Sequence, residues 1–199
     1  MNIRIVALYL VLVATPGLGQ ESREPAQSAA ERAAMLDTLQ RGKPIKGSRE
    51  QYRHLPEVFA VARGAKETPQ EAIARIGAAD GQLLEIKGRL ALFRSARQKA
   101  ASVEGIGGSA VYPVVLNSRT GTLGVLTGTL VVKPKSMADA ALIANSRGLE
   151  KGKEYPQLQT VFYRVKVGAD IADAAAALQT DPRIESAYPE IIEYVRLPK

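Results

Sequence analysis

Few side chains in this sequence could do chemistry. His54 is the only histidine, and a Ser–His–Asp assembly would also need a nucleophile in a recognisable setting, yet the sequence has no G-x-S-x-G motif. The chain has no cysteine, which excludes disulfides, thiolate zinc sites and cysteine nucleophiles. We therefore expect that the protein is not an enzyme, and we interpret His54, in the segment YRHLP, as a partly exposed loop histidine.

Other motifs that could carry chemistry are better explained by structure. Asp170 and Asp173 have the spacing of a helix cap, and they are not joined by the further His, Asp or Glu ligands that a metal site requires. Gly105, Gly107 and Gly108 spell GIGG, which lacks the third glycine and the trailing acid of a dinucleotide site. We expect no cofactor and no metal.

The charge of the chain favours a protein partner over nucleic acid. The formal net charge is +7, but the basic residues are dispersed among 20 acidic ones and aromatic residues make up only 5%. A nucleic-acid site would concentrate basic residues in a patch. We interpret the positive excess as a source of solubility and of steering toward an acidic partner.

The first nineteen residues have the three-part layout of a secretory signal peptide. Arg4 precedes an apolar run from Ile5 to Ala14, and small residues follow at Gly17 and Gly19. The run is shorter than the roughly 20 apolar residues that a membrane-spanning helix needs. We predict a signal peptide at 1–19, cleavage before Gln20, and a mature protein with no membrane partner.

The next segment, 20–49, reads as a leader followed by a helix. Its first part is rich in Ala, Ser, Gln and charged residues, with little to bury. A helix is expected near Ala29 to Leu39, ended by Arg41-Gly42 and Pro44.

Residues 50–98 are predicted to form a small α+β domain. EVFAVA (57–62) reads as a strand, and Thr68-Pro69 with Glu71 caps a helix through Ile76. LLEI and RLALF flank Lys87-Gly88, which suggests a hairpin. The glycine-rich stretch that follows predicts a linker over 99–109.

Residues 110–193 show a clearer order of elements. Two β-rich runs, 110–116 and 123–133, flank the turn residues NSRTGT. Ser136 and Asp139 have the spacing of a capping box for a helix to Arg147, which Gly148 ends. A half-buried strand is expected over 161–167.

The final part of this region supplies a second helix and a last strand. Asp170 caps a second helix through Leu178, and a strand over 184–188 precedes Pro189. If 149–155 adds a weak strand, the order is β-α-β-β-α-β. This order predicts a ferredoxin-like α+β fold, an antiparallel sheet with two helices on one face.

This region resembles the propeptides of subtilisin-like proteases over about residues 124–199. Those domains run from a glycine-led strand through a helix that ends in glycine, to a second strand and a short helix. The matching positions are Gly128, Leu130, Val131, Val132, Lys133, Gly148, Leu149, Val165, Gly168, Asp170, Leu178, Asp181, Pro182, Ile184, Tyr188 and Pro189.

A propeptide would be followed by its protease domain, whereas this sequence ends at Lys199. It therefore resembles the free-standing external chaperones that some Gram-negative bacteria export beside a kexin-like serine protease, with a domain added before the propeptide-like one. The resemblance implies a 1:1 complex in which the sheet packs on two surface helices of the protease. It also implies that the C-terminal tail enters the active-site cleft, and that the protein resides in the periplasm or outside the cell with the protease.

The chemistry of the tail can be argued from its residues, Tyr194, Val195, Arg196, Leu197, Pro198 and Lys199. An extended peptide can add to an exposed strand edge in a protease cleft, with alternate side chains giving specificity. Pro198 suits a position whose N–H is unused, and Lys199 would fill an acidic specificity pocket. Because no peptide bond follows Lys199, the bound tail would already be a product. The plain alternative is a frayed chain end.

We therefore expect an exported chaperone that assists folding of a secreted subtilisin-like protease in trans and inhibits it with its tail. One alternative is a plain periplasmic protease inhibitor without chaperone activity. A second alternative is a hydrolytic enzyme of unknown kind, which the missing pair of nucleophile and base disfavours.

Overall fold

The computed structural model describes residues 29–78, 80–95, 111–166 and 169–193. The predicted signal peptide, the predicted linker at 99–109 and the tail at 194–199 lie outside these ranges. The elements are α1 (Ala29–Asp37), β1 (Pro44–Lys46), β2 (Gln51–Ala62), α2 (Pro69–Arg75), β3 (Gln82–Lys87), β4 (Leu90–Arg94), β5 (Val111–Asn117), β6 (Leu123–Pro134), α3 (Ala140–Arg147), β7 (Glu150–Tyr155), β8 (Thr160–Arg164), α4 (Ile171–Gln179) and β9 (Ile184–Ile192).

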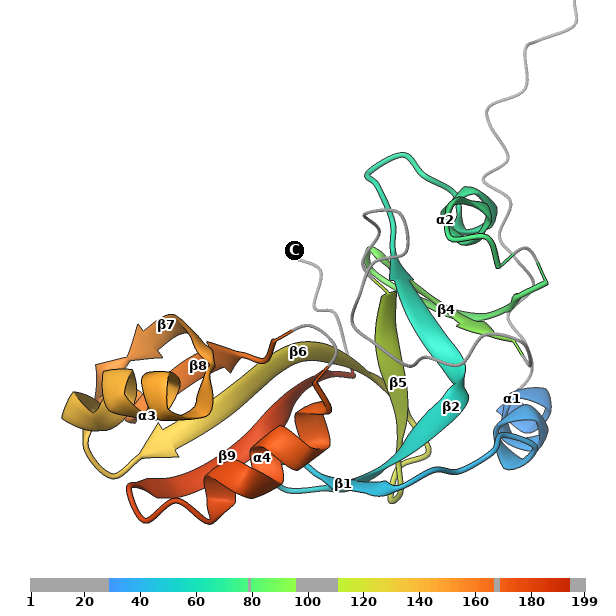
Figure 1. Cartoon of the computed structure of the whole chain (residues 1–199). Helices are drawn as coiled ribbons and strands as arrows, with labels where there is room; N and C mark the ends of the chain where they lie inside the picture. Colours follow the sequence, from blue (N-terminus) through green and yellow to red (C-terminus); the bar gives the residue numbers. More distant parts are fainter. Residues whose placement is uncertain (1–28, 79, 96–110, 167–168, 194–199) are drawn as a thin grey trace, which may run out of the picture.

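The nine strands form one antiparallel sheet in the order β3-β4-β2-β5-β6-β8-β7, with β1 added to β2 and β9 added to β6. We call the part from α1 to β5 the N-terminal unit and the part from β6 to β9 the C-terminal unit. Figure 1 shows the N-terminal unit at one end of the long strand β6 and the other strands of the C-terminal unit along both sides of it, with α3 and α4 together on one side of the C-terminal unit.

Strand β6 pairs with strands of both units. Val125 pairs with Val114 of β5 and with Ile192 of β9, whereas Val131 pairs with Phe162 of β8 and with Tyr188 of β9. A strand has only two edges, so β5 and β8 lie one after the other along one edge while β9 runs along the other.

The C-terminal unit confirms the predicted fold class. Its elements follow the order β6-α3-β7-β8-α4-β9, and its strands lie in the order β9-β6-β8-β7. Residues of both helices share a core with inward-facing residues of β6 and β8, so both helices cover the same face of the sheet. The buried hydroxyl of Tyr163 donates to the carbonyl of Ala140 at 2.9 Å, which ties β8 to the start of α3.

The two predicted caps of this unit have different outcomes. Asp170 caps α4 as expected, because its Oδ1 accepts from the backbone N–H of Ala172 at 2.8 Å and of Asp173 at 3.2 Å. The prediction of a capping box at Ser136 is wrong. Ser136 Oγ accepts from the N–H of Ala138 at 3.3 Å, and Met137–Asp139 form a 3-10 turn, so the α-helix begins only at Ala140.

The prediction that the last strand ends before Pro189 is also wrong. Strand β9 continues through Pro189 to Ile192. Pro189 lies opposite Leu130 of β6 next to a register shift. Within the described residues β9 pairs only with β6. A proline is tolerated on such an edge strand because its missing N–H can face away from the neighbouring strand.

The N-terminal unit contains the predicted strand, helix and hairpin. The capping box of α2 is complete, since Thr68 Oγ1 accepts from the N–H of Glu71 and the Glu71 carboxylate accepts from the N–H of Thr68. One core lies between this sheet and α2, and a second core lies on the other face next to α1. His54 is in strand β2, so its interpretation as a loop residue is wrong.

Strand β1 packs against the core of the C-terminal unit although it belongs to the N-terminal unit. Ile45 and Tyr52 belong to the same buried cluster as the residues of α3 and α4. The Lys43 ammonium pairs with Asp170 and lies 3.1 Å from Oδ1 of Asp173, at the start of α4. Residues of the first strands of the N-terminal unit thus contribute directly to the core of the ferredoxin-like unit.

Candidate protein-binding surface

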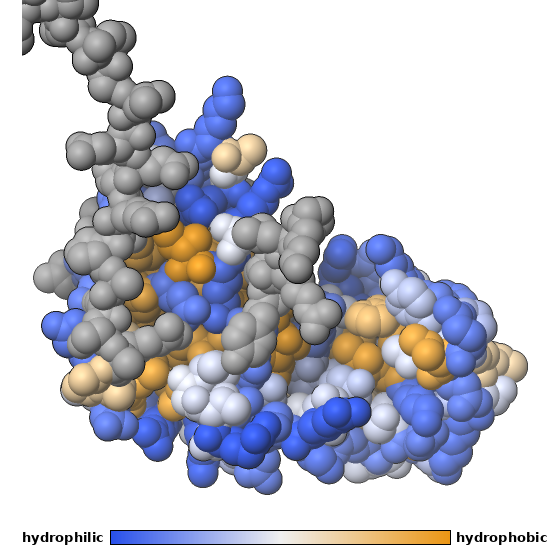
Figure 2. All heavy atoms as spheres, turned by 180° about the vertical axis from the view of Figure 1, so that it is seen from behind, coloured by the Kyte–Doolittle hydropathy of each residue, from blue (hydrophilic) through white to orange (hydrophobic). Residues whose placement is uncertain are grey.

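The C-terminal sheet has a second face that points away from α3 and α4. Val131 lies at its centre, opposite Phe162 on one side and Tyr188 on the other, and all three side chains are half-buried. Each strand alternates between buried positions on the helix side and partly exposed positions on this side. We call it the open face, because none of the described helices covers it. Figure 2, seen from this side, shows an apolar area over the C-terminal unit with hydrophilic residues around it.

Aromatic side chains extend the open face toward β7. Tyr155 and Phe162 pack edge to face, with ring centroids 5.7 Å apart and planes at 69°. Gly152 permits this close packing of β7, since a Cβ there would lie 3.0 Å from the carbonyl oxygen of Phe162. Beyond Tyr155 the connection to β8 exposes Leu158, whose accessible fraction is 63%. Exposed apolar residues that cluster with polar neighbours are typical of protein interaction sites.

The charged residues around this face form exposed pairs. Lys133 lies 2.8 Å from Glu185, Lys151 lies 2.8 Å from Glu154, and Arg164 approaches Glu150 only to 3.8 Å. Such solvent-exposed pairs contribute about 0–1 kcal/mol each. A partner could therefore exchange them for its own charges at little cost in free energy.

The root of the predicted binding tail is fixed to the N-terminal unit. Tyr194, Val195, Arg196, Leu197, Pro198 and Lys199 lie outside the described residues, but Glu193 immediately before them is held at two points. Its carbonyl oxygen accepts from Lys87 Nζ at 2.7 Å, and its Oε1 accepts from Asn117 Nδ2 at 2.9 Å. Lys87 and Asn117 are both buried.

Sequence reasoning missed both of these anchoring residues. Lys87 appeared only as part of a hairpin turn, and Asn117 only as the first of the turn residues NSRTGT. A hydrogen bond between a side chain and a backbone carbonyl that lie 106 positions apart in the sequence leaves no periodic signal that a single sequence could show.

His54, the histidine considered in the sequence analysis, lies in a partly buried environment. It is half-buried in β2, and this burial lowers the pKa of its imidazole, with Asp170 acting in the opposite direction and Lys43 adding to the decrease. Among the described residues, no group of three or more His, Asp or Glu side chains could hold a metal ion. Within the same ranges, no helix is long and apolar enough to cross a membrane.

Comparison with known proteins places the chain in a family. Residues 68–195 match the family model described as the open reading frame 2 N-terminal domain, ORF_2_N. The chain belongs to the ORF_2_N family. The ORF_2_N region begins at the cap of α2 and reaches past β9, so it includes the open face, Lys87, Asn117 and Glu193, whereas α1 and β1 precede it.

One solved structure is similar to part of this ORF_2_N protein. It is the crystal structure of the Aeromonas sobria serine protease (ASP) and chaperone (ORF2) complex, with 20% identity and a TM-score of 0.37. The similarity covers 49% of this chain and 99% of that chain. No curated protein matches this sequence.

Proposed function

We propose that this protein is an exported chaperone of a secreted, kexin-like serine protease of the subtilisin family, and that it inhibits the same protease after folding. The observation that carries the proposal is the open face. A ferredoxin-like sheet has both helices on one side and, on the other, partly exposed apolar residues that none of the described helices covers. Membership of the ORF_2_N family is compatible with this binding role.

The open face supplies the docking surface in this proposal. Val131, Phe162 and Tyr188 form an apolar centre with charged residues at its border, which is the usual layout of a protein interface. Two surface helices of the protease would lie across these strands. Aromatic residues at the centre of an interface commonly carry much of its binding energy, so Phe162 and Tyr188 are the expected main contacts.

Chaperone activity follows from presenting a folded surface to an unfolded partner. A protease of this class must form many contacts between residues far apart in its sequence, and such contacts slow folding. A sheet that binds only the native arrangement of two helices stabilises that arrangement as it forms. The same selective binding stabilises the folded product by mass action.

Inhibition is assigned to the tail that follows Glu193. In the proposed complex it adds as an extended strand to the edge of the active-site cleft, and the Lys199 side chain enters an acidic specificity pocket. The Lys87 and Asn117 contacts to Glu193 fix the point from which the tail leaves the sheet. The protein acts as a 1:1 binding partner in the periplasm, or outside the cell together with the protease.

Refolding and inhibition assays test the two parts of the proposal separately. The probe is a secreted subtilisin-like protease of the source organism, denatured and diluted with or without an equal amount of this protein, with cleavage of a dibasic fluorogenic peptide as readout after the chaperone is removed. A higher active fraction with the protein present supports chaperone activity. Inhibition of native protease without any gain in refolding would favour the plain inhibitor, and failure of both would overturn the proposal.

A further inference from the structure

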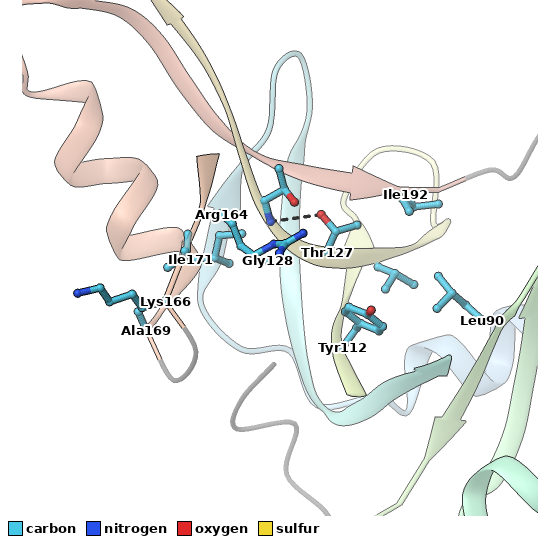
Figure 3. Close-up of a pocket in the computed structure, with 12 residues that line it drawn as sticks. Leu90, Tyr112, Thr127, Gly128, Arg164, Lys166, Ala169, Ile171 and Ile192 are labelled. Carbon is cyan, nitrogen blue, oxygen red and sulfur yellow. Dashed lines mark hydrogen bonds between the residues drawn. The ribbon is translucent and has the colours of Figure 1, made fainter. Parts of the chain in front are cut away.

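The two units enclose a hollow of about 400 Å³ at their junction. Its lining on one side comes from the N-terminal sheet and on the other from β8 and α4, and Figure 3 shows these side chains on both sides of β6. The size is within the roughly 300–1,000 Å³ that is usual for ligand pockets. We call this hollow the junction cleft and define it by Leu90, Tyr112, Val125, Arg164, Ile171 and Ile192.

The cleft exists because β6 changes its neighbour. Pairing with β5 ends at Val125, and pairing with β8 begins at Thr129. Gly128 lies between them with φ of 81°, a conformation that favours glycine. β5 and β8 diverge from this point and leave a gap between them. A ferredoxin-like unit without the N-terminal sheet would lack one wall of the cleft.

The wall from the N-terminal unit is apolar, whereas the wall from β8 and the residues after it combines apolar side chains with two cations. Leu90, Tyr112 and Ile192 supply apolar surface, whereas the described lining residues include the cations Arg164 and Lys166 and no acidic side chain. Lys166 extends toward Gly148, where its Nζ lies 3.4 Å from a Cβ placed on that glycine. The cation that faces the cleft is therefore Arg164, and Figure 3 shows it beside Gly128 and Thr127.

Arg164 is available for a new partner. Its side chain is 71% exposed, and its ion pair with the equally exposed Glu150 spans 3.8 Å. A guanidinium can bind a carboxylate through two parallel hydrogen bonds, which gives orientation as well as affinity. The charge of this wall thus favours a carboxylate, and the neighbouring wall favours an apolar group.

The cleft continues into the open face. Thr129 and Arg164 line the junction cleft and also the hollow over β7 and β8 that contains Tyr155 and Phe162. A protein that docks on the open face therefore reaches the cleft without crossing a covered surface.

We propose that the junction cleft binds an extended segment of the partner protein in which a carboxylate pairs with Arg164 and an adjacent apolar side chain packs against Tyr112 and Leu90. This inference rests on the proposed function only in naming the protease as the source of the segment. It gives the N-terminal unit a role in recognition, because that unit supplies the apolar wall.

The test titrates the full-length ¹⁵N-labelled protein with three nonapeptides and follows the amide signals of Tyr112, Gly128 and Ile192. The first peptide has a central Glu-Leu-Glu between Gly-Ser flanks. The second has Lys-Leu-Lys in its place, and the third has Glu-Ser-Glu. The Arg164→Glu variant removes the cleft cation, and Arg49→Glu is the matched control because Arg49 is exposed in the turn between β1 and β2.

We expect the Glu-Leu-Glu peptide to shift the cleft signals and to bind more tightly than either of the other two. Arg164→Glu should weaken this binding about tenfold or more, because a charge-assisted hydrogen bond is lost, and Arg49→Glu should leave it unchanged. Equal binding of the Lys-Leu-Lys or Glu-Ser-Glu peptide, shifts confined to other surfaces, or unchanged binding by Arg164→Glu would overturn the inference.

No protease enters this titration, so its failure would leave the proposed chaperone function standing. Failure of the refolding and inhibition assays with cleft binding intact would remove the protease as the source of the segment and keep the cleft as a peptide site.

Discussion

The ammonium group of Lys87 donates a hydrogen bond of 2.7 Å to the carbonyl oxygen of Glu193, across 106 positions of the sequence. Lys87 is at the end of β3 in the N-terminal unit, and Glu193 directly follows β9 in the C-terminal unit. The same ammonium lies 2.9 Å from the Glu85 carboxylate, so this buried cation is paired. The edge strand β3 and the end of β9 are thereby joined at the root of the proposed inhibitory tail.

Replacing this lysine should loosen the tail without unfolding the protein. In Lys87→Met the Glu193 carbonyl and the Glu85 carboxylate lose a buried donor, which typically costs about 1–3 kcal/mol. We expect faster amide hydrogen exchange near Glu193 and a higher inhibition constant against the protease. Lys135→Met, at an exposed site after β6, is the control. An inhibition constant equal to that of the wild type would show that the anchor has no part in inhibition.

Removing the end of the tail should separate inhibition from folding. Deletion of Leu197, Pro198 and Lys199 is expected to raise the inhibition constant sharply while the circular dichroism spectrum stays unchanged. Lys199→Ala alone should cost about 3–5 kcal/mol of binding, because it leaves a buried acid in the protease without its partner. If the truncated protein inhibits as well as the wild type does, binding depends on the sheet alone.

A charge at the centre of the open face should abolish docking. Phe162→Glu places a carboxylate among Val131, Tyr155 and Tyr188, where a protein partner would desolvate it, so we expect at least tenfold weaker binding of the protease and no gain in refolding yield. Leu142→Glu is the matched control, because Leu142 is 57% exposed and belongs to α3 on the opposite face. Unchanged binding by Phe162→Glu would contradict docking through this face.

Limited proteolysis tests the predicted domain division. We expect a protease to cut between Ala100 and Gly108, within the predicted linker. The fragments should remain associated after the cut, because β5 pairs with β2 along seven residue positions, from Tyr52 opposite Asn117 to Val61 opposite Val111. Size-exclusion chromatography of the nicked protein provides the measurement. Separation of the fragments in native buffer would mean that the sheet pairing does not hold them.

Acid stability should depend on Asp181. Hydrogen bonds from Arg183, first through its side chain and then through its backbone N–H, hold the pKa of Asp181 well below the usual range. A carboxyl group with a lower pKa in the folded state stabilises the protein fully above its unfolded pKa of about 3.9, and this contribution is lost as the pH falls toward the folded pKa. The stability difference between wild type and Asp181→Asn, from urea unfolding, should therefore shrink between pH 5 and pH 2.5. A difference that is constant over this range would contradict the prediction.

The sequence predicted elements whose signals are local. The Asp170 and Thr68 caps depend on residues within one helical turn, and both were confirmed. Alternation along β8 depends on neighbours two positions apart and was confirmed as far as Arg164, where the strand ends earlier than the predicted 161–167. The Ser136 motif had the right spacing, but its first turn tightened into a 3-10 turn, which changes the N–H group that the serine can reach.

Features that depend on tertiary contacts were not predictable in this way. The three-residue strand β1 is too short for any periodic pattern, although Ile45 is 4% exposed within the C-terminal core. His54 has turn-like neighbours in sequence but lies in β2, because pairing with β5 continues through that position. The open face was expected from the order of strands and helices, whereas the junction cleft depends on how β6 is shared.

The place of Ile45 also sets the order in which the chain can finish folding. This residue lies in β1, yet its neighbours in the buried cluster include Ile171 of α4 and Ala187 of β9, far along the sequence. The apolar side chain of Ile45 therefore lacks part of its buried packing until α4 and β9 have taken their places. The C-terminal core is therefore complete only once β1 and β9, which lie near opposite ends of the described residues, have come together.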